Sequence, residues 1–359
     1  MQGYHGETFA IDTLMDMKRR FDAPLEAELH AAVGQIDGFA PLLGKMVRFH
    51  LGWIETDGKS TPAEVRRVIQ GKRVRPYLNF LTAESLGTSP AKVAPIAAAI
   101  ELLHNFTLIH DDIQDRSPNR RHRATVWRVW GDAQAINAGD ALFATAQRAL
   151  LRMSRDLVSP TLLLRMVDAF NAMTIDIVQG QTADLEFELR NAISPEDYLA
   201  MIRGKTAAIL RFSAWAGAIA AGASDDVADQ MGGMGESLGL GFQIRDDILG
   251  VWGESSVTGK DQADDIRRRK KSLPILLLLD QATPEEAKRL VTLYGAEKID
   301  EHGVAEVRGM LDTHGIEAQA NAMVTGFHQE ASASLASSGI TSGSSGLMQL
   351  LQMLDIRTS

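Results

Sequence analysis

Three aspartates within five residues, Asp111, Asp112 and Asp115, are the side chains best placed for chemistry. On a helix, residues four apart share a face, so Asp111 and Asp115 point together and Asp112 lies about 100° around. The preceding residues are mostly apolar. Carboxylates crowded against an apolar wall repel one another unless a cation joins them, and a hard divalent ion such as Mg²⁺ is the simplest one. By itself, the same motif also fits an exposed acidic helix end.

A second acidic pair, Asp246 and Asp247, follows the apolar segment 238–244. Two such segments in a helical protein can face one another across the interior of a bundle, where bundle proteins build their metal sites. Because both acidic groups interrupt an apolar stripe, the pair favours metal binding over a solvated surface.

Basic residues occur in tight groups near these motifs, at 72–75, 120–123, 205, 260 and 267–271. Most could be solvated surface charge. Lys205 differs because the apolar residues 207–210 follow it, and a buried lysine needs an anionic partner. Carboxylates that hold Mg²⁺, together with arginines and lysines, describe a polyphosphate site. No Walker or Rossmann glycine loop is present, which argues against ATP or NAD.

The elements that must position these residues are predicted to be helices. A hydroxyl residue before a proline is a pattern typical of helix starts, and it predicts starts at Thr61-Pro62, Ser89-Pro90, Ser159-Pro160, Ser194-Pro195 and Thr283-Pro284. Gly71 and Gly295 stand where helices would end. Apolar residues recur at spacings of three and four, and alternating strand patterns are nearly absent. The sequence therefore predicts an all-α fold.

No domain boundary is evident, so we expect one all-α domain over residues 1–359, built as a single large helical bundle. Residues 1–60 are predicted to form a helical arm, most helical over 39–53. The Ser- and Gly-rich segment 332–346 is predicted to be flexible, and residues 347–357 to form a short amphipathic helix.

Composition narrows the classes of protein. The chain has no cysteine, which excludes disulfides and thiolate zinc sites and favours a reducing cytoplasm. Its net charge of −9 argues against nucleic-acid binding. The first twenty residues lack the order of a secretory signal. The most apolar stretch, 206–223, contains Arg211 and no aromatic belt, so it is predicted to be a buried helix and not a transmembrane segment.

Taken in order, the motifs resemble the trans-isoprenyl diphosphate synthase (polyprenyl synthetase) family from about Arg67 to Pro274. They are GKRVRP, ELLHNFTLIHDDIQD, RRHRATVW, NAGDALF, GQTADLEFE, GKTAAIL, FQIRDDILG and VTGKDQADDIRRRKKSLP. The resemblance implies a Mg²⁺-dependent prenyltransferase of isoprenoid biosynthesis that condenses isopentenyl diphosphate with an allylic diphosphate. It also implies a homodimer and a central cavity lined by two facing aspartate-rich helices.

The resemblance assigns roles residue by residue. Metal ligands would be Asp111 and Asp115 with Asp112 in support, and Asp246 with Asp247 nearby, holding three Mg²⁺ ions that Mn²⁺ could replace. The allylic diphosphate would contact Arg120, Lys205 and Lys260, and isopentenyl diphosphate would contact Lys72, Arg75, His104 and Arg121. Thr206 and Gln243 would steady the reacting region, Lys270 would lie in a closing loop, and Gln181 and Asp184 would line the cavity. The predicted catalytic set is Asp111, Asp115, Lys205, Asp246 and Lys260.

Three positions depart from the family pattern. Gly250 stands where many members have a third aspartate, which predicts weaker metal support. The segment 122–125 lacks the usual glycine and proline, which leaves the shape of that loop open. A usual glycine pair is reduced to Gln70-Gly71.

Product length depends on the residues one turn before the first motif, because the growing chain runs along that helix. Phe106 and Thr107 lie five and four residues before Asp111, and the motif has no two-residue insertion. An aromatic residue there without the insertion resembles the archaeal style of geranylgeranyl diphosphate synthase. We therefore expect a twenty-carbon product, with farnesyl diphosphate or a longer chain as alternatives.

Three other classes of protein share part of the pattern. A class I terpene cyclase would not need the GKRVRP and arginine-pair motifs. A non-catalytic subunit of a heteromeric synthase typically loses an aspartate motif, whereas both are intact here. A purely structural helical bundle would not explain the paired metal and phosphate groups.

Overall fold

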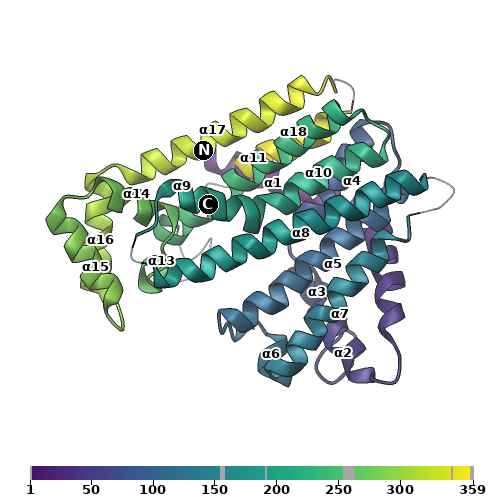
Figure 1. The fold of residues 1–359 in the computed structure, drawn as a ribbon, viewed down its shortest axis with the longest axis horizontal. Coiled ribbons are helices and arrows are strands. Elements are labelled where there is room, and N and C mark those ends of the chain that lie inside the picture. The colour runs from purple at the N-terminus through teal and green to yellow at the C-terminus, as the bar shows by residue number, and fades with distance from the viewer. Residues whose placement is uncertain (1, 154–157, 191, 254–262, 341–342, 356–359) are drawn as a thin grey trace.

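The computed structural model describes residues 2–153, 158–190, 192–253, 263–340 and 343–355. Almost every element in this part of the chain is a helix, which confirms the predicted all-α class (Figure 1). The strands within the described ranges form one small antiparallel hairpin, β1 (Asn119–Arg120) and β2 (Arg123–Ala124), with Arg120 paired to Arg123.

The helices follow in the order α1 (Gln2–Val33), η1 (Gly34–Ile36), α2 (Pro41–His50), α3 (Ala63–Ile69), α4 (Val74–Ser85), α5 (Pro90–Gln114), α6 (Val126–Trp130), α7 (Asp132–Leu150), α8 (Pro160–Leu189), α9 (Pro195–Ile202), η2 (Arg203–Ala207), α10 (Ala208–Ala220), α11 (Asp225–Trp252), α13 (Asp264–Arg267), α14 (Leu273–Gln281), α15 (Pro284–Gly295), α16 (Glu301–Thr313), α17 (Ile316–Ser337) and α18 (Ser345–Asp355). Of the two short turns, η1 is a 3₁₀ turn and η2 is a π-helical turn.

The two helices that end in aspartate motifs, α5 and α11, belong to one packed series. Helix α4 packs against both α5 and α10, and α10 packs against α11. Helix α7 covers another side of α5, and α17 covers α11 (Figure 1). This arrangement carries both motifs to a shared region, beside which α8 and η2 pack against each other.

The predicted helix starts are confirmed at four of five places. Helices α5, α8, α9 and α15 begin at the proline, and Ser194 and Thr283 complete capping boxes at α9 and α15. Helix α3 begins one residue later than predicted, at Ala63, without a capping side chain. Gly71 follows α3 with φ +66°, a conformation that suits glycine.

The prediction for residues 1–60 is wrong in detail, because α1 over 2–33 is the main helix and not 39–53. Phe21, Leu25 and Leu29 repeat every four residues among charged neighbours and are buried in the main core. Phe21 stacks on Phe80 of α4 with ring centroids 5.0 Å apart. The arm is thus part of the bundle, since its apolar stripe needs the core to cover it.

The prediction that 332–346 is flexible is wrong for its first part. Helix α17 continues to Ser337, because Ala331 and Leu335 are buried against the core and offset the weak helix propensity of the serines. The closing amphipathic helix is confirmed as α18, with Leu347, Leu350 and Met353 buried; residues 356–357 of that prediction lie outside the described residues.

The apolar stretch 206–223 forms part of η2 and all of α10, and most of α10 is buried, as predicted. Among the described residues, α5 alone is long and apolar enough to cross a membrane, and 72% of its most apolar window is buried inside the protein. It is the central helix of the core.

Candidate active site

The first aspartate motif lies at the carboxyl end of α5, where the helix leaves the core. Asp111 is half-buried, Asp112 is buried and Asp115 caps the helix end. Burial raises the pKa of Asp111 to about 6; Lys205 lowers it in part, whereas Asp115 raises it further. Burial also raises the pKa values of Asp112 and Asp115. The helix dipole adds negative charge at this end, so the group is poised to accept cations.

Asp112 forms an ion pair with Arg120. The Arg120 side chain donates to Asp112 Oδ1 from Nε at 2.9 Å and lies 2.8 Å away through Nη2. The hairpin turn that follows has positive φ at both Arg121 (51°) and His122 (63°), a conformation that costs energy in residues other than glycine. This turn gives the loop its shape, which the sequence left open. It leaves Arg120 beside α5 and lets Arg121 donate to the carbonyl of Ile69.

Lys205 lies in the π-helical turn η2 and pairs with Asp184 of α8, with Nζ 2.5 Å from Oδ2. The expected anionic partner is thereby found. Gly180 makes the approach of α8 to η2 possible, since a Cβ there would lie 2.2 Å from the backbone nitrogen of Lys205. The charge of Lys205 acts on both Asp111 and Asp115, which places the lysine opposite the first motif.

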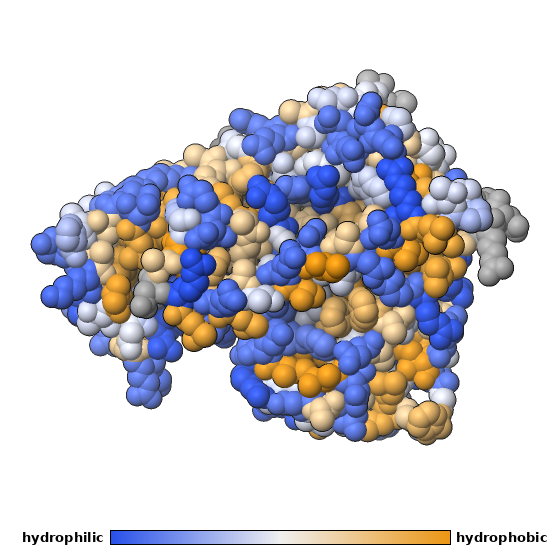
Figure 2. All heavy atoms as spheres, viewed as in Figure 1, coloured by the Kyte–Doolittle hydropathy of each residue, from blue (hydrophilic) through white to orange (hydrophobic). Residues whose placement is uncertain are grey.

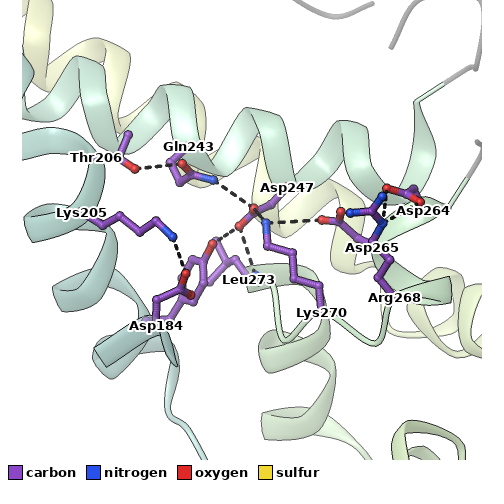
Figure 3. A network of polar contacts seen from close by, with 11 residues as sticks. Asp184, Lys205, Thr206, Gln243, Asp247, Asp264, Asp265, Arg268, Lys270 and Leu273 are labelled. Carbon is purple, nitrogen blue, oxygen red and sulfur yellow. Dashed lines mark hydrogen bonds and ion pairs between the residues drawn. The ribbon is translucent and has the colours of Figure 1, made fainter. Parts of the chain in front are cut away.

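The two aspartates of the second motif differ in exposure. Asp246 is half-exposed, whereas Asp247 is fully buried. Asp247 accepts hydrogen bonds from Lys270 Nζ (3.1 Å), Gln243 Nε2 (3.3 Å), the Leu273 amide (3.3 Å) and the Tyr198 hydroxyl (Figure 3). A carboxylate offers about four acceptor positions. Four donors thus occupy the acceptor positions of Asp247, and its predicted place near a metal stays a prediction.

Thr206 and Gln243, which are predicted to steady the reacting region, are hydrogen-bonded to each other. The Thr206 hydroxyl donates to Gln243 Oε1 at 3.0 Å, and Gln243 in turn donates to Asp247 (Figure 3). Gln181, on α8, donates to Gln114 Oε1 at 2.8 Å and so joins α8 to the end of α5.

Four predicted anion-binding residues line one cavity of about 320 Å³. Lys72, Arg75, His104 and Arg121 meet there, beside Glu101 and the apolar Phe242 and Leu354. Arg75 Nη1 lies 3.4 Å from His104 Nε2. Burial, followed by the charges of Arg75 and Arg121, holds the pKa of His104 well below its ordinary value, so His104 is neutral. A concentration of cationic side chains around a neutral histidine suits a diphosphate.

The remaining predicted residues are distributed as follows. Lys260 lies in the segment 254–262, outside the described residues. Phe106 is half-buried one turn before Asp111 and packs against Phe143 of α7, with ring centroids 5.4 Å apart. The Thr107 hydroxyl donates to the His104 carbonyl within α5.

The sequence motifs missed the support that α1 gives to this cavity. Arg73 is buried with φ 51°, and it donates to Asp22 (3.1 Å) and Glu26. Asp22 also accepts from the Tyr77 hydroxyl at 2.5 Å, and Glu26 from Gln70 at 2.9 Å. The spacing of these acids along the apolar stripe of α1 was the signal that could have found them. Residues 22 and 26 thus fix the backbone between Lys72 and Arg75.

We expect Glu26→Gln to lower the free energy of unfolding by about 1–2 kcal/mol, because a buried guanidinium loses part of its charge compensation. Urea unfolding measures the change. The matched control is Glu28→Gln, which removes a more exposed pair with Arg152 and should cost under about 0.5 kcal/mol. Equal costs for the two variants would contradict the anchoring role of Glu26.

The carboxylates fit a divalent ion that is completed by other ligands. Within the described residues, no three His, Asp or Glu side chains gather closely enough to hold a metal by themselves. Mg²⁺ usually takes one or two carboxylates and leaves its other positions to water and phosphates. Burial is the main cause of the raised pKa values at Asp111 and Asp115, and neighbouring carboxylates add to it; a divalent ion would offset both effects.

Asp111→Asn should raise the thermal midpoint of the metal-free protein at pH 8 and leave it unchanged near pH 4. The pKa of Asp111 in the folded protein, about 6, exceeds its ordinary value of 3.8. The stability that protonated Asp111 contributes is therefore fully present below pH 4, and it is lost as the pH rises through 6. Because Asp111 is only half-buried, the gain should be on the order of 1–2 kcal/mol. The control is Asp312→Asn on the exposed face of α16. A lower midpoint for Asp111→Asn at pH 8 would contradict the raised pKa.

Comparison with known proteins shows which family this chain resembles. The polyprenyl synthetase family model matches residues 61–311. A (2E,6E)-farnesyl diphosphate synthase of Mycobacterium tuberculosis is 41% identical over 239 residues, which are 67% of this chain and 64% of that protein. A geranylgeranyl diphosphate synthase of the same organism is 38% identical over 75% of this chain and 73% of its own length.

Solved structures agree with the sequence relatives. A polyprenyl synthetase from Streptomyces coelicolor has a TM-score of 0.84 at 32% identity, covering 95% of this chain and 98% of that one. A geranylgeranyl pyrophosphate synthetase from Pyrococcus horikoshii also has a TM-score of 0.84, at 27% identity, covering 97% and 98%. The family match extends over more than half of the chain and includes both aspartate motifs and the cationic cavity: the chain belongs to the polyprenyl synthetase family.

Proposed function

We propose that the protein is a trans-prenyl diphosphate synthase that joins isopentenyl diphosphate head to tail to an allylic diphosphate. The observation that carries this proposal is the cavity lined by Lys72, Arg75, His104 and Arg121, beside a group of carboxylates with raised pKa values. A synthase needs these two adjoining sites, one for each diphosphate, whereas a terpene cyclase needs only one. The names of the relatives, farnesyl and geranylgeranyl diphosphate synthase, support the same class of reaction.

In the proposed mechanism, Asp111, Asp115 and Asp246 would hold Mg²⁺, which would supply positive charge to offset the charge that develops on the departing pyrophosphate. Lys205 and Arg120 hold the allylic diphosphate and stabilise the same charge. Asp184 and Asp112 keep those two cations oriented before substrate arrives.

The second substrate is held from the other side. Lys72, Arg75 and Arg121 bind the diphosphate of isopentenyl diphosphate, and the neutral His104 donates one hydrogen bond. The double bond attacks the allylic cation, and the released pyrophosphate accepts the proton lost from the new chain. Phe242 and Leu210 give the cavity apolar walls that exclude water from the cation.

We propose geranylgeranyl diphosphate as the product. Phe106 stands one turn before Asp111 and rests on Phe143, so it can block a product chain that grows along α5 and thus form the floor of the product tunnel. Relatives that make shorter and longer products are both similar to this chain, so the product rests on Phe106 and on the uninserted DDIQD motif.

The deciding experiment incubates the purified protein with Mg²⁺, isopentenyl diphosphate and each allylic starter, followed by chain-length measurement of the products. We expect chains that end at twenty carbons, with Mn²⁺ able to replace Mg²⁺. Absence of any prenyl diphosphate longer than the starter would refute the synthase, and a cyclic hydrocarbon would favour the terpene cyclase.

We propose further that the protein acts as a homodimer in the cytoplasm. Ile136 of α7 and Ile175 and Val178 of α8 are 44%, 57% and 51% exposed. The two helices are joined by Gln147 donating to Asn171 at 2.8 Å. Figure 2 shows apolar atoms at the surface along the course of α8. Light scattering at micromolar concentration tests the dimer, and a monomer there would contradict it.

A further inference from the structure

The space beside Gly250 on α11 is filled by a carboxylate from another segment. A Cβ added at Gly250 would lie 2.3 Å from Asp265 Oδ2 and 2.4 Å from its Cγ, closer than any real side chain approaches. Asp265 belongs to α13 and is 5% exposed. Gly250 is the position at which the sequence lacks a third aspartate. The structure thus places a carboxylate there after all, delivered from fifteen residues further along the chain.

Asp265 and Asp247 enclose the ammonium of Lys270 between them. Lys270 Nζ lies 3.1 Å from Asp247 Oδ1 and 3.7 Å from Asp265 Oδ2 (Figure 3). The backbone amide of Lys270 also donates to the Asp265 carbonyl at 2.8 Å, which closes the turn between them. The lysine is therefore held at both ends by the same residue.

The surroundings make this arrangement rigid. Asp247 is fixed by the buried Tyr198 hydroxyl and by Leu273, so it cannot follow Lys270 if the lysine moves. Burial would lower the pKa of Lys270, but the charges of Asp247 and Asp265 outweigh it and raise the pKa. The charge of Lys270 in turn acts on Asp115 of the first motif. One protonated lysine thereby links the buried acids to the site.

We propose that Asp265 is a positioning residue, which occupies the place left by the missing side chain at Gly250 and, with Asp247, holds Lys270 toward the diphosphate site. The role of Lys270 in turnover rests on the proposed function. The contact between Asp265 and Lys270 rests on distances alone. Any side chain at position 250 would force the Asp265 carboxylate to move from the place it now occupies beside Lys270.

The first test removes the charge of Asp265 and keeps its shape. Asp265→Asn should lower kcat about tenfold with a smaller change in KM, because a misplaced lysine stabilises the departing pyrophosphate less. In a Lys270→Met background, the same change should have no further effect, since Asp265 acts through Lys270. The control is Asp264→Asn, which alters the neighbouring acid paired with the exposed Arg268 and should leave kcat within twofold.

The second test concerns the shared space. Gly250→Asp, which restores the common family residue, should lower activity more than Asp265→Asn does, because two carboxylates then compete for one place. The double variant with Gly250→Asp and Asp265→Gly should be at least tenfold more active than Gly250→Asp alone. Full activity in Gly250→Asp, or no recovery in the double variant, would overturn the assignment of one shared place.

A third measurement does not depend on turnover. In thermal unfolding, Asp265→Asn and Lys270→Met should be coupled, so that the double variant is less destabilised than the sum of the two single variants. If the protein makes no product, the proposed function fails while this coupling still tests the contact. Independent effects on stability, or a loss of kcat for Asp265→Asn that persists in the Lys270→Met background, would refute the positioning role.

Discussion

Replacing Asp111 with alanine should reduce product formation by at least about a thousandfold while the protein stays folded. Burial raises the pKa of Asp111 to about 6, so a metal ion would favour its charged form. Unlike Asp112, which is bound to Arg120, and Asp247, which is saturated by four donors, it faces the charge of Lys205 across the cavity. The variant removes a ligand that has no protein substitute nearby.

Steady-state turnover at saturating Mg²⁺ and at tenfold higher Mg²⁺ measures this effect. Asp312→Ala on the exposed surface of α16 controls for the loss of one negative charge and should keep full turnover. Normal turnover in Asp111→Ala would remove the metal assignment for the first motif.

Phe106→Ala should lengthen the product by one or more five-carbon units. The Phe106 ring stacks at an angle on Phe143 and contacts His110, so it stands as a block between α5 and α7. Removing the ring opens a space of about the size of one isoprene unit, and an apolar chain can fill that space more favourably than water can. Chain-length analysis of products from extended incubations measures the change.

The control for Phe106→Ala is Phe106→Leu, which keeps most of the bulk and should leave the product length unchanged. If Phe106→Ala makes an unchanged product, Phe106 is not the floor of the tunnel. Phe143→Ala then separates the two rings: a longer product in that variant alone would move the floor from α5 to α7.

Local signals predicted most of the fold. Ser159, Ser194 and Thr283 cap helices where their proline neighbours indicated, because these contacts lie within four residues. The course of α1 was mispredicted since its helix is held by Phe21 packing on Phe80, a contact across 59 positions of sequence. The extension of α17 likewise depends on Leu335 meeting the core.

The site was predicted as a set of residues but not as a network. The four residues of the cationic cavity do meet, and the expected partner of Lys205 is Asp184. The motifs could not predict which of two identical neighbouring side chains would be buried. Asp246 and Asp247 are adjacent aspartates, yet only the packing of Tyr198 and Leu273 determines which of them is buried. The same holds for Asp265, because its close approach to Gly250 is evident only from the structure.

The β1–β2 hairpin fixes the spacing of two arginines that reach different parts of the site. Arg120 and Arg121 are consecutive, yet Arg120 reaches Asp112 of the first aspartate motif and Arg121 lines the cationic cavity and donates to the Ile69 carbonyl. Neighbouring residues are about 3.8 Å apart along the backbone, and Arg121 lies in the tight turn itself. In the proposed synthase, these two arginines would set the spacing between the two diphosphates.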